Sequence, residues 1–157
     1  MKAVMIYDDF DCAAKAAAML QRAARRAEPG ELWDIRPWRV DVLRLAAASD
    51  EALTEAFDAD VIIFAGRRAY AMPTWIEQWL KNWATRRAIG DAALATIRDE
   101  VDRKFAAPIA GRLSRFAALH GLEIITENDA VLASEHHDIP LTKERENHLA
   151  GLFQLNE

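Results

Sequence analysis

A pair of carboxylates, Asp8 and Asp9, directly follows the short apolar run 2–7 (KAVMIY). An apolar run that acidic residues end is typical of a buried β-strand. Side chains at such a strand end could hold a divalent cation or act as a general base. The alternative is a solvated loop in which Asp9 or Asp11 caps the next helix, and we favour it because acidic caps are common.

A second charged pair, Arg67 and Arg68, follows Gly66 and the apolar run 61–65 (VIIFA). Two arginines at this place could bind an anion. They could equally form salt bridges to Asp8 and Asp9, since the ends of neighbouring parallel strands meet at one edge of a sheet. We favour the salt bridges, which at a surface contribute about 0–1 kcal/mol to stability.

Three tryptophans, Trp75, Trp79 and Trp83, recur at every fourth residue and would share one face of a helix. They could pack against a sheet in the core. Because tryptophan is enriched at protein interfaces, we also expect part of this stripe to form a homodimer interface.

Other candidate groups give weaker signals. The tetrapeptide 135–138 (EHHD) holds four potential metal ligands, but adjacent side chains seldom converge on one ion, so no metal site is predicted. Cys12 near the start of one helix and His120 near the end of another are interpreted as structural.

The elements that would position these groups alternate between strand and helix. Strands are expected at 2–7, 32–40, 61–65, 92–97 and 122–126, and helices at 12–27, from Ser49 to about 57, 73–84, 108–120 and 142–153. Pro37 lacks an N–H group and places its strand at a sheet edge or ends it there. The pattern predicts one domain over 1–157, an α/β three-layer sandwich with a parallel sheet.

The segment 60–83 resembles part of the flavodoxin-like reductases that bind FMN. In that family a strand leads to a loop with a tyrosine and a proline, then to a helix that ends in Lys-Asn and an aromatic residue. Tyr70, Pro73 and the tripeptide 81–83 match this pattern. The resemblance implies the strand order 2-1-3-4-5, with any ligand at the point where strands one and three diverge. It also implies that Tyr70 would flank a flavin ring and that backbone N–H groups of 66–69 would meet its polar edges.

The first loop of this chain differs from that family. FMN-binding flavodoxins hold the phosphate there with serine, threonine and glycine. Here the loop reads YDDFDCAAK, with three carboxylates and none of those residues. Two like charges at 4 Å cost about 1 kcal/mol in water and more where solvent is limited. We therefore predict no cofactor, with FMN as the alternative.

Response-regulator receiver domains share the topology and are similar in their acidic pair, matched by Asp8 and Asp9. A receiver also needs an aspartate at the end of the third strand, where this chain has the dipeptide 65–66 (AG). Arg98 and Glu127 stand near the positions where a receiver has a hydroxyl and a lysine. The similarity therefore concerns the fold and leaves a pseudo-receiver as a further alternative.

The length, net charge and cysteine content of the chain limit the classes of partner that it could bind. The chain has 157 residues, a net charge of -5 and one cysteine, so no intrachain disulfide is expected. An acidic chain argues against nucleic acid and anionic membranes. No membrane span or signal peptide is recognised, which predicts a cytoplasmic location.

These observations predict a flavodoxin-like domain without a recognisable catalytic or phosphate-binding site. We expect it to act through protein contacts, as a homodimer or with another protein partner. The alternative is a flavin- or nucleotide-binding oxidoreductase that uses the loop after the third strand. Asp8, Asp9, Gly66, Arg67, Arg68 and Tyr70 are the candidate ligand-binding residues, and Trp75, Trp79 and Trp83 the candidate interface residues.

Overall fold

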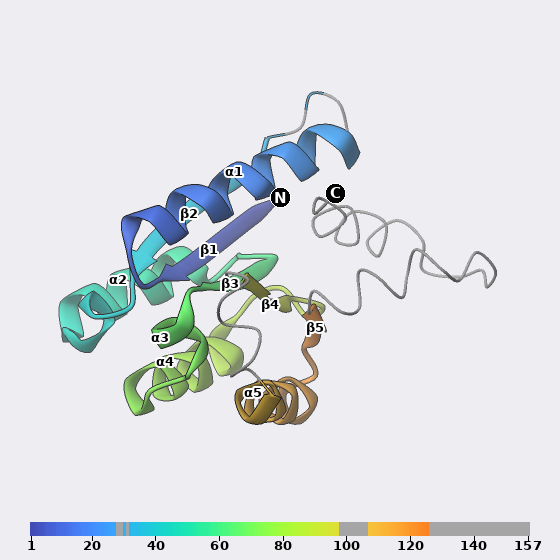
Figure 1. The fold of residues 1–157 in the computed structure, drawn as a ribbon. Helices are drawn as coiled ribbons and strands as arrows, with labels where there is room; N and C mark the ends of the chain where they lie inside the picture. The colour runs from blue at the N-terminus through green and yellow to red at the C-terminus, as the bar shows by residue number, and fades with distance from the viewer. Residues whose placement is uncertain (28–29, 31, 98–106, 126–157) are drawn as a thin grey trace.

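The computed structural model describes residues 1–27, 30, 32–97 and 107–125. Its five strands are β1 (Lys2–Tyr7), β2 (Asp34–Arg39), β3 (Val61–Ala65), β4 (Ala93–Ile97) and β5 (Glu123–Ile125). All pair in parallel, in the order β2-β1-β3-β4-β5 (Figure 1). This confirms the predicted α/β class and the flavodoxin-like strand order. The predicted helix at 142–153 and the tetrapeptide 135–138 lie outside the described residues.

Helices cover both faces of the sheet. They are α1 (Phe10–Ala27), the 3-10 turn η1 (Val42–Arg44), α2 (Ala46–Ala56), α3 (Arg67–Tyr70), α4 (Thr74–Arg86) and α5 (Ala107–His120). Figure 1 shows α1 along one face, with α3, α4 and α5 on the other. Among the described helices, none combines the length and apolar character that crossing a lipid bilayer requires.

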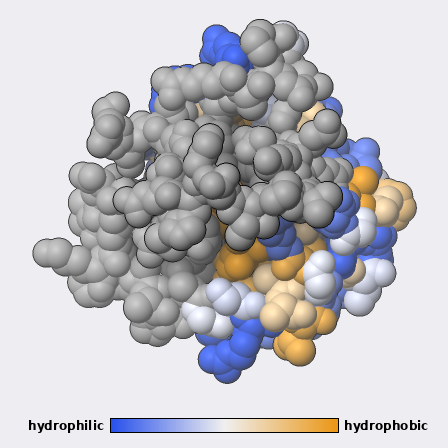
Figure 2. All heavy atoms as spheres, turned by 90° about the vertical axis from the view of Figure 1, so that its right-hand side faces the viewer, coloured by the Kyte–Doolittle hydropathy of each residue, from blue (hydrophilic) through white to orange (hydrophobic). Residues whose placement is uncertain are grey.

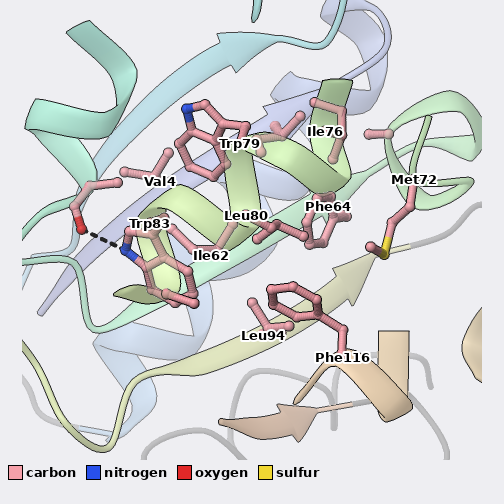
Figure 3. Close-up of a cluster of buried hydrophobic side chains, with 14 of the residues drawn as sticks. Val4, Ile62, Phe64, Met72, Ile76, Trp79, Leu80, Trp83, Leu94 and Phe116 are labelled. Atoms are coloured by element: carbon pink, nitrogen blue, oxygen red, sulfur yellow. Dashed lines mark hydrogen bonds between the residues drawn. The ribbon is translucent and has the colours of Figure 1, made fainter. Parts of the chain in front are cut away.

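Alternation along the strands divides the core into two parts. On one face, Met5 of β1 and Ile63 of β3 pack with Leu20 of α1. On the other, alternate residues such as Phe64 and Leu94 pack with side chains of α2, α4 and α5 (Figure 3). All five residues of β3 are buried, as a central strand with helices on both sides requires.

Pro37 lies in β2, which among the described strands pairs with β1 alone and so forms an edge of the sheet. An edge strand needs ladder hydrogen bonds on one side alone, and a residue without an N–H group is tolerated there. The edge position predicted from Pro37 is therefore confirmed. The expected cap of α2 was wrong: Ser49 lies inside the helix, and Leu45 occupies the N-cap position without a side-chain hydrogen bond.

The tryptophan stripe of α4 faces the core. Trp79 and Trp83 are each 1% exposed, and their indole N–H groups donate to the carbonyls of Ser49 (3.3 Å) and Ala56 (2.8 Å), as Figure 3 shows for Trp83. Trp75 is half-buried and donates to the Val40 carbonyl at 3.3 Å. The prediction that this stripe forms a homodimer interface is therefore wrong for Trp79 and Trp83, because side chains buried within one chain present no surface to a second chain.

Candidate functional site

The candidate site lies at the carboxyl ends of β1 and β3. The chain leaves β1 toward α1 on one face of the sheet and leaves β3 toward α3 and α4 on the other (Figure 1). The register pairs Tyr7 with Ala65, and the N–H group of Asp8 donates to the Ala65 carbonyl at 3.1 Å. The topology therefore sets Asp8 beside the loop that begins at Gly66, at the point where α/β sheets of this order bind ligands.

The carboxylate of Asp8 is bound by backbone groups of that loop. Its Oδ2 accepts the N–H of Arg68 at 2.5 Å, and its Oδ1 accepts the N–H of Ala69 at 2.6 Å. Both donors belong to the first turn of α3, whose N–H groups have no partner within the helix. Hydrogen bonds of N–H to an ionised carboxylate are among the stronger ones in proteins. Asp8 thus ties the end of β1 to the loop after β3.

Gly66 makes this approach sterically feasible. Its φ of +102° lies in a region that side chains rarely adopt, and an ideal Cβ would stand 2.8 Å from Cγ of Asp8. That separation is shorter than a carbon–carbon contact permits. Two independent reasons therefore require glycine at this position: the positive φ of its backbone and the close approach of the Asp8 carboxylate.

Burial raises the pKa of Asp8 above its ordinary value of 3.8. The N–H groups of Arg68 and Ala69 and the charge of Arg68 lower the pKa, but the loss of solvent outweighs them. The carboxylate is thus held by backbone dipoles in a partly desolvated place.

The guanidinium of Arg68 turns away to Asp41, which follows β2. Nη1 donates to Oδ2 of Asp41 at 3.2 Å, and Nη2 donates to Oδ1. Nη2 of Arg39 lies 3.5 Å from the same carboxylate. The predicted salt bridge of Arg68 to Asp8 or Asp9 was therefore wrong in its partner: Arg68 gives Asp8 its backbone N–H and gives Asp41 its side chain.

Asp9 caps α1. Its Oδ1 accepts the N–H of Cys12 at 2.8 Å, the bond that an N-cap side chain makes to the third helical residue. Asp11 adds a negative charge within the first turn. Within the ranges that the structure describes, no three residues among His, Cys, Asp and Glu are grouped to hold a metal ion. For Arg67 and Tyr70 the structure describes the backbone, in α3, and not the side chains.

These contacts bear directly on FMN. In the family pattern, the phosphate would use N–H groups at the start of α1, and the ring edge would use N–H groups of the loop after β3. Here Asp9 accepts the N–H of Cys12, and Asp8 accepts those of Arg68 and Ala69. A phosphate or a polar ring edge that used these same N–H groups would have to displace a carboxylate of the chain.

Comparisons with known proteins leave the function open. The sequence matches no protein-family model and no curated protein. One similar solved structure is a Klebsiella pneumoniae protein provisionally assigned as a quinone reductase. It is 13% identical, the match covers 97% of this chain and 82% of that one, and the TM-score is 0.38. So distant a likeness says nothing of activity, and the fold rests on the strand order itself.

Proposed function

We propose that this chain is a flavodoxin-like domain that binds no flavin at the switch point and acts through contacts with other protein chains. The observation that carries the proposal is the Asp8 carboxylate on the N–H groups of Arg68 and Ala69, at 2.5 and 2.6 Å. An anionic or carbonyl-bearing ligand would have to displace this carboxylate and leave it unpaired in a partly desolvated site. Leaving a partly buried charge without its hydrogen-bond partners costs about 2–3 kcal/mol.

Exposed apolar side chains support contacts with protein. Phe57 at the end of α2 is 52% exposed, and Leu119 near the end of α5 is 81% exposed. The dipeptide 87–88 links these two helix ends: Ala88 donates to the Phe57 carbonyl and Arg87 to the His120 carbonyl, both at 2.8 Å. Figure 2, seen from the side where β1 begins, shows apolar side chains between hydrophilic ones over the part not drawn in grey. A homodimer remains part of the proposal, through surfaces other than Trp79 and Trp83.

Two measurements on the purified chain test the proposal. FMN fluorescence should show no saturable quenching when protein is added up to about 100 µM, a range that covers most specific cofactor sites. Light scattering after size exclusion should give a dimer mass. Saturable quenching at low micromolar protein would refute the claim that the chain binds no flavin. A monomer mass at the highest protein concentration would refute the claim that it forms a homodimer.

A flavin- or nucleotide-binding oxidoreductase is the second candidate. The observation that favours it is the pair of adjacent backbone N–H groups of Arg68 and Ala69, which already hold a negatively charged group. If Asp8 swung away, the same donors could meet a ligand. Quenching of FMN by the Asp8→Ala variant and by the natural chain alike would favour this candidate over the first.

A further inference from the structure

Basic and apolar side chains meet at the carboxyl end of β2. We call Arg39, Arg44, Leu45 and Arg68 together the β2-end surface. The side chains of Arg39 and Arg68 are 49% and 58% exposed, and Leu45 is 64% exposed. The guanidinium groups of Arg39 and Arg68 lie at one carboxylate, that of Asp41, and the exposed Arg44 follows three residues later, on a chain whose net charge is -5. The local charge is opposite in sign to that of the whole chain.

The guanidinium groups of this surface are held in place. Asp41 binds Arg68 through two hydrogen bonds and lies near Arg39. The guanidinium carbon of Arg44 stands 4.9 Å from the ring centroid of Trp75, within the range of a cation–π contact. Arginines fixed in this way lose less side-chain entropy when a partner binds.

Leu45 is not explained by the stability of the fold. It occupies the N-cap position of α2 with φ -84° and ψ 126°, but makes no side-chain cap bond and is mostly exposed. Serine, threonine, asparagine or aspartate would stabilise that position. A residue that breaks a local rule without a structural gain points to a function outside the fold. Exposed leucine beside fixed arginines has the composition of a recognition surface, where arginine is enriched.

We propose that the β2-end surface binds an acidic segment of a partner protein, with an apolar side chain of the partner on Leu45 and its carboxylates on Arg44, Arg39 and Arg68. Charge complementarity decides this choice of partner, since unlike charges favour encounter and fix orientation. The inference rests on the proposed function, because it names the partner chemistry of a domain that acts through protein contacts.

The test uses the full chain and fluorescein-labelled peptides read by anisotropy. One peptide alternates aspartate and glutamate with leucines, a second replaces the acids by lysine, and a third replaces the leucines by serine. The natural chain should bind the first at least about tenfold more tightly than either of the others. Added salt should weaken this binding.

Variants locate the contact. Leu45→Asp should weaken binding of the acidic peptide at least about tenfold while leaving the melting temperature equal or higher, because aspartate is a favoured cap. Arg44→Glu should weaken it similarly. Arg115→Glu on α5 makes the same change of charge at an exposed position and should alter binding less than about twofold. An unchanged or higher melting temperature of Leu45→Asp would show that weaker binding does not come from loss of folding.

Several results would overturn the inference. They are equal affinity for the acidic and basic peptides, equal weakening by Arg115→Glu and Arg44→Glu, no binding at all, or loss of a homodimer in Arg44→Glu, which would assign the surface to a second copy. The proposed function is tested separately by FMN. A chain that binds neither peptide nor FMN would refute this inference alone, whereas FMN binding would refute the proposed function.

Discussion

Replacing Gly66 by alanine tests whether the Asp8 carboxylate is fixed on the loop after β3. The new Cβ would meet Cγ of Asp8 at 2.8 Å and Oδ2 at 2.9 Å, and the backbone would keep a φ of +102°. The strained backbone costs about 1–3 kcal/mol. Displacing the carboxylate from the N–H groups of Arg68 and Ala69 costs about 2–3 kcal/mol more, discounted because the Arg68 bond is exposed.

Gly30 provides a matched control. Its φ is +104°, nearly that of Gly66, but an added Cβ would meet no atom within 4 Å. Gly30→Ala should therefore lower the free energy of unfolding only by the cost of the strained backbone, about 1–2 kcal/mol once the lower entropy of the unfolded chain with alanine is subtracted. Gly66→Ala should lower the free energy of unfolding by about 3–5 kcal/mol. Urea unfolding followed by tryptophan fluorescence measures both.

A double-mutant cycle identifies the cause. In an Asp8→Ala background the Cγ and Oδ2 atoms, which make the two shortest contacts, are gone, while the Cβ of residue 8 stays 3.0 Å from the new methyl group. The cost of Gly66→Ala should then fall by about 2 kcal/mol toward that of Gly30→Ala. If Gly66→Ala and Gly30→Ala were equally costly, or if removing Asp8 changed nothing, the carboxylate would not be held where the structure places it.

Three further predictions concern single side chains. Trp83→Phe should lower the free energy of unfolding by about 1–3 kcal/mol, because it removes the buried indole N–H bond to the Ala56 carbonyl and leaves space where the larger ring was packed. In urea unfolding, a loss no larger than that of Trp75→Phe, whose ring is only half-buried, would contradict this. The carboxyl ¹³C shift of Asp8 should titrate with a midpoint above pH 3.8, and a midpoint below 3.8 would contradict the assigned burial. Because the folded pKa is the higher one, the contribution of Asp8 to the free energy of unfolding is full below pH 3.8 and is lost as the pH rises through the folded pKa. Arg68→Ala should cost less than about 1 kcal/mol in thermal unfolding, as its guanidinium is exposed, and a larger loss would mean that the bond to Asp41 holds the edge together.

The sequence predicted strands and helices best where the residue types favoured a single kind of element. The five apolar residues 61–65 lie between Asp60 and Gly66, and the observed β3 has the predicted bounds. The start of α2 was missed because Leu45, at its N-cap, is not a residue type that signals a helix start. The stripe on α4 had the right period, but periodicity alone does not separate a core face from an interface.

The contacts of the candidate site could not be predicted in the same way. Asp8 and Arg68 are 60 residues apart, and Asp41 and Arg68 are 27 apart. Sequence reasoning brought the acidic and basic residues to one edge of the sheet, yet it assumed that side chains would pair with side chains. That Asp8 takes backbone N–H groups depends on α3, a single turn in a stretch expected to be a loop. Gly66 was the available signal, since a glycine after a buried strand marks a close approach.

The most direct test follows the amide signals of Arg68 and Ala69 in ¹⁵N-labelled protein while FMN, and separately inorganic phosphate, is added. Because Asp8 already accepts both N–H groups, we predict that neither signal shifts in a saturable way. Saturable shifts of these two amides would show that a ligand replaces the carboxylate and would contradict the account.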